Sequence, residues 1–424
     1  MEIYVVKSGD TLYAIARRFG LTVDALREAN QLQNPSLLSV GQALLIPRED
    51  ALYTVRQGDT LYAIARRYGL PLPCLIAANP QIADPNRIRI GQTLRVPLGG
   101  CGQGEILVNG YISRASAASL EAQLPYLSFL SPFSWRADAE GGLVKDFALD
   151  DSGAENDKVA RLLTVTNQRA GGGFSGEIAH AVFRDEAVQG RFLENLERAL
   201  AEGGYYGLNL DFEYVFPYDR EAYNSFLQRL SEHLHCLGYL LVTALAPKVG
   251  DEQQGLLYTA HDYAAHGRKA DYVVLMTYEW GYTYGPPMAV APIDRVRQVL
   301  DYAASVMPAG KILLGVPNYG YDWTLPFRQG SAARVMSNIG AVTLAGQAGA
   351  AVEYDERSQA PFFRYYDSDG RQHEVWFEDA RSIRAKYALV GEYGLAGVSI
   401  WNLNTYYRTL WLLLESMYGA EKLI

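Results

Sequence analysis

The pattern of apolar and polar positions divides the chain into two unlike parts. Residues 1–97 contain short alternating segments and short amphipathic stretches, whereas from residue 105 onward longer apolar runs alternate with helical stretches. Apolar runs of this length, bounded by polar segments, are typical of buried parallel strands. We expect eight such strands, at residues 106–112, 126–131, 162–166, 207–214, 240–246, 272–278, 312–317 and 395–401.

Helical stretches follow most of these strands, among them residues 177–201, 220–236 and 293–305. Repeated β-then-α units over about 320 residues predict an α/β fold, a (β/α)8 TIM barrel. The seventh unit is interrupted by strand patterns at residues 352–354, 361–366 and 374–377, with a hairpin turn at 367–370. We therefore expect a small α+β insertion at about 325–385, placed to wall one side of a cleft.

An internal repeat accounts for the first part of the chain. The segment SGDTLYAIARRFG at 8–20 recurs as QGDTLYAIARRYG at 57–69, with eleven of thirteen positions identical. Each copy predicts a strand, two short helices and a closing strand, with Asp or Thr of the Gly-Asp-Thr turn capping the first helix. This divides the chain into βααβ domains at 1–48 and 52–98, a glycine-rich linker at 99–104 and a large domain at 105–424.

The motif GDTLYAIARRFG…LREAN…LSVGQALLIP resembles the LysM domain, and the second copy resembles it equally. The resemblance implies binding of N-acetylglucosamine-containing glycans such as peptidoglycan and chitin. By that resemblance the glycan contacts fall at Gly9, Asp10, Thr11 and Leu12 in the first copy and at Gly58, Asp59, Thr60 and Leu61 in the second. The alternative is that Asp and Thr only cap helices, and the two interpretations are compatible.

Acidic residues lie on the fourth expected strand, GLNLDFEY at 207–214. Because side chains alternate along a strand, Asn209, Asp211 and Glu213 face the barrel interior. Two neighbouring carboxyls raise the proton affinity of one of them. We expect Glu213, nearer the open end, to be the general acid and Asp211 the fixed negative charge. Carboxyls on one strand lie on the same side of a scissile bond, so Asp211 is poorly placed as a nucleophile.

GLNLDFEY also resembles the fourth-strand motif of glycoside hydrolase family 18, Asp-Gly-x-Asp-x-Asp-x-Glu. The resemblance implies a retaining glycosidase in which the substrate's own N-acetyl oxygen attacks the anomeric carbon. Glu213 would then act as acid and later as base, and Asp211 would stabilise the intermediate. Tyr206 and Asn209 stand where the family has aspartates. Asn209 can still hydrogen-bond Asp211, but it carries no charge and cannot share a proton, so we expect Asp211 to ionise more readily.

Other strand ends extend this resemblance. Met276-Thr277-Tyr278-Glu279 resembles the family's Met-x-Tyr-Asp element, which implies that the Tyr278 hydroxyl holds the N-acetyl oxygen. Trp401 in GVSIWNLN corresponds to the tryptophan beneath the reacting sugar. The expected substrate contacts are Met276, Glu279, Asn318, Tyr319 and Trp401. Core packing is the alternative for Met276 and Trp401.

Charge and composition narrow the function classes. The net charge of −9 argues against a nucleic-acid binder. Residues 1–97 nevertheless carry 11 Lys+Arg against 8 Asp+Glu, which suits an anionic wall polymer. No apolar run is long enough to predict a membrane span. Three widely spaced cysteines imply no disulfide framework, and without CxxC or HExxH spacing we expect no metal site and no cofactor. We expect a monomer.

The combination of LysM repeats with this barrel resembles the spore cortex-lytic enzymes of endospore-forming bacteria, of the cortical fragment-lytic type. The resemblance implies N-acetylglucosaminidase cleavage of cortex peptidoglycan during germination. The N-terminus MEIYVVKSGD lacks the basic and apolar regions of a Sec signal, which fits a protein made in the mother cell and deposited at the spore coat or cortex. The alternatives are a non-catalytic lectin that binds peptidoglycan or chitin, and a chitinase; the presence of Glu213 argues against the lectin.

Overall fold

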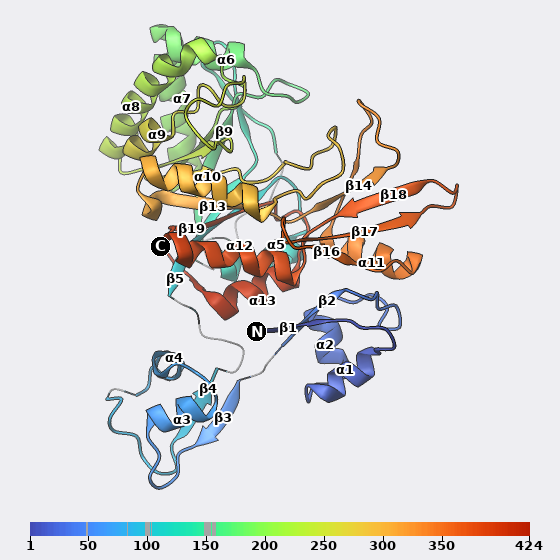
Figure 1. Cartoon of the computed structure of the whole chain (residues 1–424). Helices are drawn as coiled ribbons and strands as arrows, with labels where there is room; N and C mark the ends of the chain where they lie inside the picture. Colours follow the sequence, from blue (N-terminus) through green and yellow to red (C-terminus); the bar gives the residue numbers. More distant parts are fainter. Residues whose placement is uncertain (48–49, 83, 98–101, 103, 148–153, 155–157) are drawn as a thin grey trace.

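The computed structural model describes residues 1–47, 50–82, 84–97, 102, 104–147, 154 and 158–424. They form two small N-terminal domains, a barrel and a sheet attached to the barrel (Figure 1). The expected linker at 99–104 falls largely outside the described residues, which include only Gly102 and Gly104 of it.

The two small domains have the βααβ order that the repeat predicts. They consist of β1 (Glu2–Val5), α1 (Leu12–Arg18), α2 (Val23–Ala29) and β2 (Ala43–Ile46), and of β3 (Ala51–Thr54), α3 (Leu61–Arg67), α4 (Leu72–Ala77) and β4 (Thr93–Val96). In each domain the two strands pair antiparallel. Thr11 caps α1 by accepting the N–H of Ala14 at 3.1 Å, and Thr60 caps α3 by accepting that of Ala63. Threonine, not aspartate, therefore supplies the cap.

Eight parallel strands close into a barrel. They are β5 (Glu105–Ile112), β6 (Phe129–Pro132), β9 (Ala160–Thr166), β10 (Gly207–Asp211), β11 (Leu240–Leu245), β12 (Tyr272–Leu275), β13 (Ile312–Pro317) and β19 (Gly397–Trp401). Each strand pairs in parallel with the next, and β19 pairs with β5. Apolar side chains fill both the interior and the strand–helix layer, because both faces of such strands are buried. The predicted (β/α)8 barrel is confirmed.

Helices cover the outside of the barrel: α5 (Ala117–Glu121), α6 (Gly176–Arg184), α7 (Glu186–Gly203), α8 (Arg220–Cys236), α9 (Tyr263–Lys269), α10 (Ile293–Val306), α12 (Ala380–Tyr393) and α13 (Arg408–Met417). The single helix expected at 177–201 is in fact two. Asp185 interrupts it in an extended conformation, and its carboxylate accepts the N–H groups of Ala187 and Val188 to begin α7. The fourth strand ends at Asp211 and not at residue 214, so Glu213 lies in the loop beyond it.

Shorter elements complete the body: β7 (Trp135–Ala137), β8 (Leu143–Lys145), β20 (Gly419–Ala420) and the 3-10 turns η1 (Leu124–Tyr126), η3 (Pro217–Asp219) and η4 (Ala309–Lys311). Cys74 on α4 is disulfide-bonded, a bond that the cysteine spacing did not indicate, and Cys236 is a free thiol. Among the residues described above, no helix combines the length and apolarity that crossing a lipid bilayer requires.

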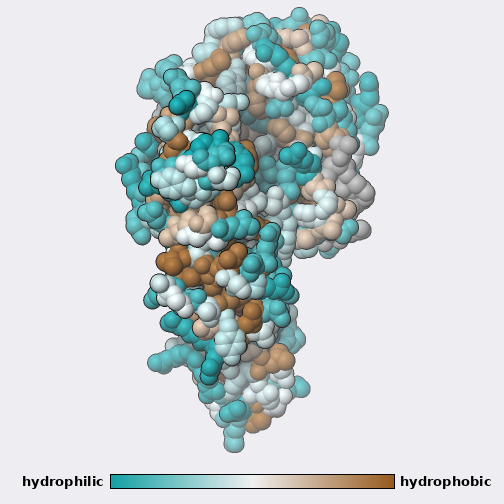
Figure 2. Space-filling model, turned by 90° about the vertical axis from the view of Figure 1, so that its right-hand side faces the viewer, coloured by the Kyte–Doolittle hydropathy of each residue, from teal (hydrophilic) through white to brown (hydrophobic). Residues whose placement is uncertain are grey.

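The insertion is a five-stranded antiparallel sheet with one helix. Its elements are β14 (Gly320–Thr324), β15 (Arg334–Met336), α11 (Asn338–Ala348), β16 (Glu353–Asp355), β17 (Ala360–Tyr366) and β18 (Gln372–Trp376), in the sheet order β15-β14-β18-β17-β16. The sheet begins at Gly320, directly after the seventh barrel strand, and α12 of the barrel resumes at Ala380. Figure 2 looks onto this side of the molecule, where the upper body is hollowed.

Candidate active site

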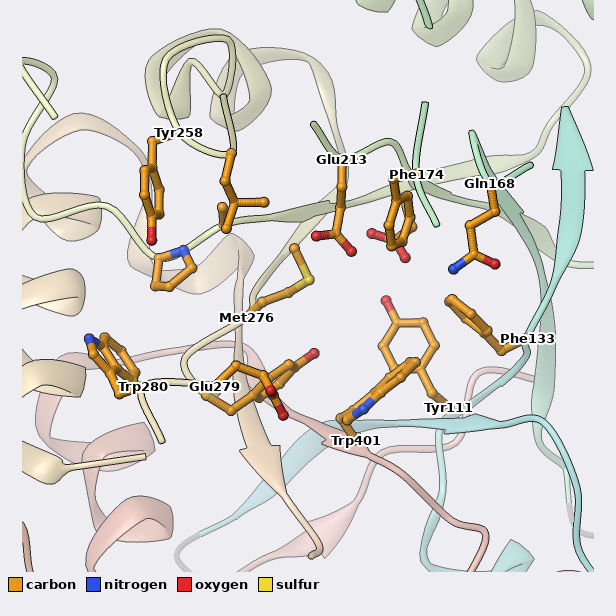
Figure 3. A pocket seen from close by; sticks show the side chains of 15 residues that line it. Tyr111, Phe133, Gln168, Phe174, Glu213, Tyr258, Met276, Glu279, Trp280 and Trp401 are labelled. Atoms are coloured by element: carbon orange, nitrogen blue, oxygen red, sulfur yellow. The ribbon is translucent and has the colours of Figure 1, made fainter. Parts of the chain in front are cut away.

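The C-terminal ends of the barrel strands surround a cavity of about 300 Å³ (Figure 3). It is lined by Tyr111, Phe133, Gln168, Phe174, Asp211, Glu213, Ala246, Pro247, Leu257, Tyr258, Met276, Tyr278, Glu279, Trp280 and Trp401. Of the residues expected from the sequence, the cavity brings together Asp211, Glu213, Met276, Tyr278, Glu279 and Trp401. Residues far apart in the chain meet here because parallel strands of a barrel end at the same face.

The backbone of Glu213 is held by the side chain of Asn167, which directly follows β9. The Asn167 oxygen accepts the N–H of Glu213 at 2.9 Å, and its amide donates to the Glu213 carbonyl at 2.7 Å. This clamp fixes the loop that carries Glu213 just beyond the strand. The sequence reasoning missed Asn167, although a polar residue at the end of a barrel strand is a signal for a functional role.

His261 holds the preceding residue of the same loop. Its Nε2 donates to the carbonyl of Phe212 at 3.0 Å, while its Nδ1 accepts the N–H of Ala246 at 2.9 Å. The backbone N–H of Ala246 can only donate, so Nε2 carries the imidazole hydrogen. Burial lowers the pKa of His261 to about 4, which keeps the ring neutral and this pattern intact at physiological pH.

The two carboxyls share a desolvated environment. Asp211, the last residue of β10, is 4% exposed. Burial raises the pKa of Asp211 to about 7 and raises the pKa of Glu213 well above its usual value, with the negative charges of Asp211 and Glu279 adding to the latter. Near neutral pH the pair therefore retains a proton, with Asp211 as the more acidic member. This is the division of roles that a general acid beside a negative stabiliser requires.

Asn209 does not hydrogen-bond Asp211, contrary to the prediction. Its amide donates to the hydroxyl of Tyr111 at 2.8 Å and to Oγ of Ser131 at 3.2 Å. Oδ1 of Asn209 and Oδ1 of Asp211 are both buried without a hydrogen-bond partner in the described part of the chain. Asp211 consequently gains no stabilisation of its anion from Asn209. Burial raises its pKa, and the expectation that Asp211 ionises more readily beside Asn209 than beside an aspartate stays a prediction.

Aromatic rings form the wall opposite the acid. Figure 3 shows Glu213 and Trp401 on opposite sides of the cavity, with Met276 between them. Trp401 packs edge-on against Tyr111 and Phe133, with ring centroids 5.3 and 5.0 Å away. These contacts hold the indole as a fixed surface of the kind on which a sugar ring stacks. Neither Tyr111 nor Phe133 was expected from the sequence: Tyr111 lies within an apolar strand, and Phe133 directly follows β6.

Tyr278 also faces the cavity, and its ring stacks near that of Trp401 with 6.4 Å between centroids. Burial raises the pKa of the Tyr278 hydroxyl well above its usual value. The hydroxyl therefore stays protonated across the physiological range and remains available as a hydrogen-bond donor. This matches the donor role that the family resemblance implies for it.

Glu279 presents its carboxylate to the cavity and is anchored from behind. Tyr319 donates to its Oε1, and Tyr321 donates to both carboxylate oxygens at 3.0 and 3.1 Å. Burial raises the pKa of Glu279, and the hydrogen bonds from Tyr319 and Tyr321 act against the rise. Tyr319 does not line the cavity, so the structure makes it a positioning residue for Glu279 instead of a direct cleft contact.

Asn318, expected as a further cleft contact, also lies outside the cavity lining. It is 5% exposed, and its amide donates to the carbonyls of Asn402 and Thr405 at 3.0 and 2.9 Å. These bonds tie the end of the seventh strand to the loop that follows Trp401. Its observed contacts therefore support the backbone beside the indole.

The Gly-Asp-Thr turns of the two small domains are alike. Asp10 accepts the Tyr4 hydroxyl at 2.7 Å, and Asp59 accepts the Tyr53 hydroxyl at 2.6 Å. Each aspartate also accepts the N–H three residues before it, and Gly9 and Gly58 turn the chain with φ near +85°. Gly9, Thr11, Gly58 and Thr60 are exposed, which leaves the surface of each turn accessible to a glycan.

Leu12 and Leu61 have a different position from the rest of those turns. Each is 3% exposed and belongs to the hydrophobic core of its own domain. The structure therefore places both leucines in the core, and the expected glycan contact at these two positions is replaced by packing beneath the turn.

Comparison with known families decides the class of the barrel. The model of glycosyl hydrolases family 18 matches residues 134–405, and the LysM domain model matches residues 4–47 and 53–97. The chain belongs to glycosyl hydrolases family 18. This family-18 glycosidase carries its Asp211–Glu213 pair at the end of the fourth barrel strand, where the sequence resemblance placed it.

Individual relatives agree with the family. The family-18 chain is 43% identical to the cortical fragment-lytic enzyme of Bacillus subtilis (strain 168), over 100% of this chain and 99% of the relative. The crystal structure of the Bacillus megaterium QM B1551 spore cortex-lytic enzyme SleL matches with a TM-score of 0.86 and 37% identity, over 100% and 99% of the two chains. A chitinase structure from Chromobacterium violaceum matches with a TM-score of 0.69 and 29% identity, over 73% and 98%.

Proposed function

We propose that this glycosidase cleaves the bond that follows an N-acetylglucosamine unit in spore cortex peptidoglycan, by substrate-assisted hydrolysis with retention of configuration. The observation that carries the proposal is that Asp211 and Glu213, two residues apart, both line the cavity, with Glu213 opposite Trp401 (Figure 3). Two carboxyls at the end of one strand do not lie on opposite sides of a scissile bond. The nucleophile of the first step therefore comes from the substrate.

In the first step the sugar stacks on Trp401 and its acetamido group lies toward Asp211 and Tyr278. Glu213 gives its proton to the glycosidic oxygen while the N-acetyl oxygen attacks the anomeric carbon from the opposite face, and the leaving sugar departs. Ionised Asp211 stabilises the positive charge that develops on the acetamido group. Tyr278, which stays protonated, donates its hydrogen to the N-acetyl oxygen and orients it.

In the second step the carboxylate of Glu213 takes a proton from a water molecule, and the water oxygen attacks the anomeric carbon. The bond to the N-acetyl oxygen breaks and the acetamido group is restored. Two inversions at one carbon give net retention. Glu213 can act first as acid and then as base because burial raises its pKa well above the usual value of a glutamate.

The substrate and the location rest on the relatives and on the N-terminal domains. The relatives that match over the whole of this chain include enzymes named for cortical fragments and for the spore cortex. Two LysM domains supply binding of an N-acetylglucosamine-containing wall glycan. We place the protein at the coat or cortex of the spore, acting as a monomer with no need of nucleic acid or a cofactor.

Product analysis tests the proposal. Purified enzyme is incubated with cortex fragments and with chitin oligomers, and the products are reduced and separated by mass spectrometry. We expect fragments with N-acetylglucosamine at the new reducing end, formed faster from cortex than from chitin. Glu213→Gln should abolish release, whereas Glu221→Gln, an exposed glutamate on α8, should not. Wild-type rates for Glu213→Gln, or muramic acid at the new end, would contradict the proposal; faster cleavage of chitin would favour the chitinase.

A further inference from the structure

The first LysM domain is packed onto the catalytic body. Ile3 on β1 lies opposite Leu45 on β2, so both side chains share one face of this small sheet. Leu45 is fully buried and belongs to the main hydrophobic core of the barrel, and Ile3 packs against the same core. An apolar pair of strand residues therefore docks the first domain against the barrel helices.

Polar contacts reinforce this docking. The side chain of Gln31 accepts the N–H of Arg408 at 2.6 Å and donates to the carbonyl of Tyr406 at 3.3 Å, which ties the domain to the start of α13. The N–H of Val352 in the insertion donates to the carbonyl of Val40 at 2.8 Å. Because these hydrogen bonds reach both the barrel and the insertion, the first domain is held in one orientation relative to the active-site face.

The second LysM domain has a charged group at the matching position. Leu52 on β3 lies opposite Arg95 on β4, the pair that corresponds to Ile3 and Leu45. Leu52 is 77% exposed and Arg95 is also exposed. The hydrophobic core of this domain consists of residues 51–96 alone, and the domain lies apart from the barrel (Figure 1). Arg95 forms an ion pair with Asp50, and desolvating this exposed ion pair would oppose docking of this face on the barrel.

The second domain is also much more basic. Residues 53–97 contain six arginines and two aspartates, with no lysine or glutamate, whereas residues 3–47 contain four basic and three acidic residues. Arg87 and Arg89 stand where the repeat has Leu37 and Ser39 in the first domain. Both arginines are exposed. The undocked domain therefore presents positive charge at the positions that correspond to the docked surface of its twin.

We infer that the two LysM domains have different roles: the first is a fixed part of the catalytic body, and the second captures a polyanionic glycan through Arg87 and Arg89. The inference deepens the proposed function, because peptidoglycan with free peptide carboxylates is the polymer of that charge. Attraction between exposed charges draws the polymer to the second domain, and added salt screens it. The docked first domain then holds its own glycan turn at a constant position relative to the cleft.

Sedimentation with insoluble cortex peptidoglycan tests the capture. The full chain carries Glu213→Gln so that the polymer stays intact. We expect Arg87→Glu with Arg89→Glu to weaken binding about tenfold at about 50 mM NaCl, with the difference shrinking toward about 0.5 M. The matched reversal in the first domain, Lys7→Glu with Arg17→Glu, should change binding less than about twofold. Arg87→Lys with Arg89→Lys should bind as the parent does.

Equal loss from both reversals would overturn the inference, as would no loss from Arg87→Glu with Arg89→Glu. Hydrolysis of a soluble fluorogenic N-acetylchitooligosaccharide by the otherwise wild-type chain separates the two proposals. Arg87→Glu with Arg89→Glu should leave this rate unchanged. If the unaltered chain fails to hydrolyse the probe or cortex fragments, the proposed function fails while the sedimentation result still decides the capture.

Small-angle scattering tests the docking. Leu45→Arg gives the first domain the residue that its twin carries at this position, so the LysM fold tolerates the change. We expect the largest dimension of the full chain to increase and a new protease-sensitive site to appear between residues 47 and 53. Arg95→Leu in the second domain is the matched control and should not increase the dimension. Scattering by Leu45→Arg identical to that of the parent would contradict a docked first domain.

Discussion

The side-chain nitrogen of Asn209 donates a hydrogen bond to the hydroxyl of Tyr111 at 2.8 Å. It continues a buried polar network beneath the active-site carboxyls, in which Ser131 donates to Asn109 at 2.7 Å and Asn109 donates to Ser399 at 2.9 Å. The Asn209 amide therefore makes its hydrogen bonds inside the barrel and not to Asp211. Burial, and not a hydrogen bond from Asn209, sets the raised pKa of Asp211.

Asn209→Asp restores the family's acidic pattern, and we expect it to impair this enzyme at low pH. A second buried carboxyl beside Asp211 repels its negative charge and raises its pKa further. Aspartate also removes the hydrogen that Asn209 donates to Ser131. The acidic limb of the pH–rate profile should move to higher pH, with about a tenfold loss of kcat/KM at pH 6. A profile identical to that of the wild type would show that position 209 does not affect Asp211.

The unaltered enzyme should show a bell-shaped pH dependence of kcat/KM on a soluble fluorogenic substrate. The productive form has Asp211 ionised and Glu213 protonated. Activity should rise as pH increases through about 7, where Asp211 loses its proton, and fall at higher pH as Glu213 ionises. Asp211→Asn should remove the rising limb along with most of the activity. A rising limb centred near pH 4 would contradict the desolvation of Asp211.

Asp211→Asn should also stabilise the fold above neutral pH. The folded-state pKa of about 7 lies above the unfolded value of 3.8, so the folded protein holds the proton more tightly. The free energy of unfolding contributed by this group is therefore largest below pH 4 and is lost as pH rises through 7. Removing the charge should raise the free energy of unfolding at pH 8 by roughly 1 to 3 kcal/mol.

Asp219 provides the control for that stability measurement. It is also buried, but it accepts hydrogen bonds from His180 and Arg184, each at 2.8 Å. Asp219→Asn should therefore lower the free energy of unfolding by roughly 1 to 3 kcal/mol, since it removes one side of a charge pair. Denaturant titrations at pH 5 and pH 8 compare both variants. Equal destabilisation by both substitutions would show that Asp211 is paired.

Tyr319→Phe tests the support of Glu279. The variant keeps the ring but removes a hydroxyl that donates to the Glu279 carboxylate, while the bonds from Tyr321 remain. If Glu279 positions the sugar, KM should rise roughly five- to twentyfold, the equivalent of about 1 to 2 kcal/mol, with kcat little changed. Glu279→Gln should have the larger effect. A fall in kcat at constant KM would assign Tyr319 to the chemical step.

Local sequence patterns predicted much of the fold. Eight apolar runs predicted the eight barrel strands, because parallel strands are buried on both faces. The repeat predicted two βααβ domains, because near-identical segments fold alike. The break at Asp185 was missed, since a capping aspartate inside a long helical pattern is outweighed by the periodicity around it. The insertion strands β14 and β15 were also missed; β14 begins at Gly320, only three residues after the end of a barrel strand.

The sequence likewise predicted some residues of the candidate site and missed others. Alternation along one strand was enough to place Asp211 and Asn209 on the inward face. Asn167, His261 and Tyr111 were not found, because their roles depend on which strand ends lie next to the fourth strand.

By itself the sequence determined the strand and helix repeat, the pairing of LysM domains with a family-18 barrel and the presence of two carboxyls two residues apart. The tertiary structure alone decided which partners those carboxyls have. It buried Asp211, directed Asn209 to Tyr111, and docked Leu45 while leaving Arg95 in solvent. The physical reason is that side-chain spacing along a strand is local, whereas desolvation and hydrogen-bond choice depend on atoms contributed by distant segments.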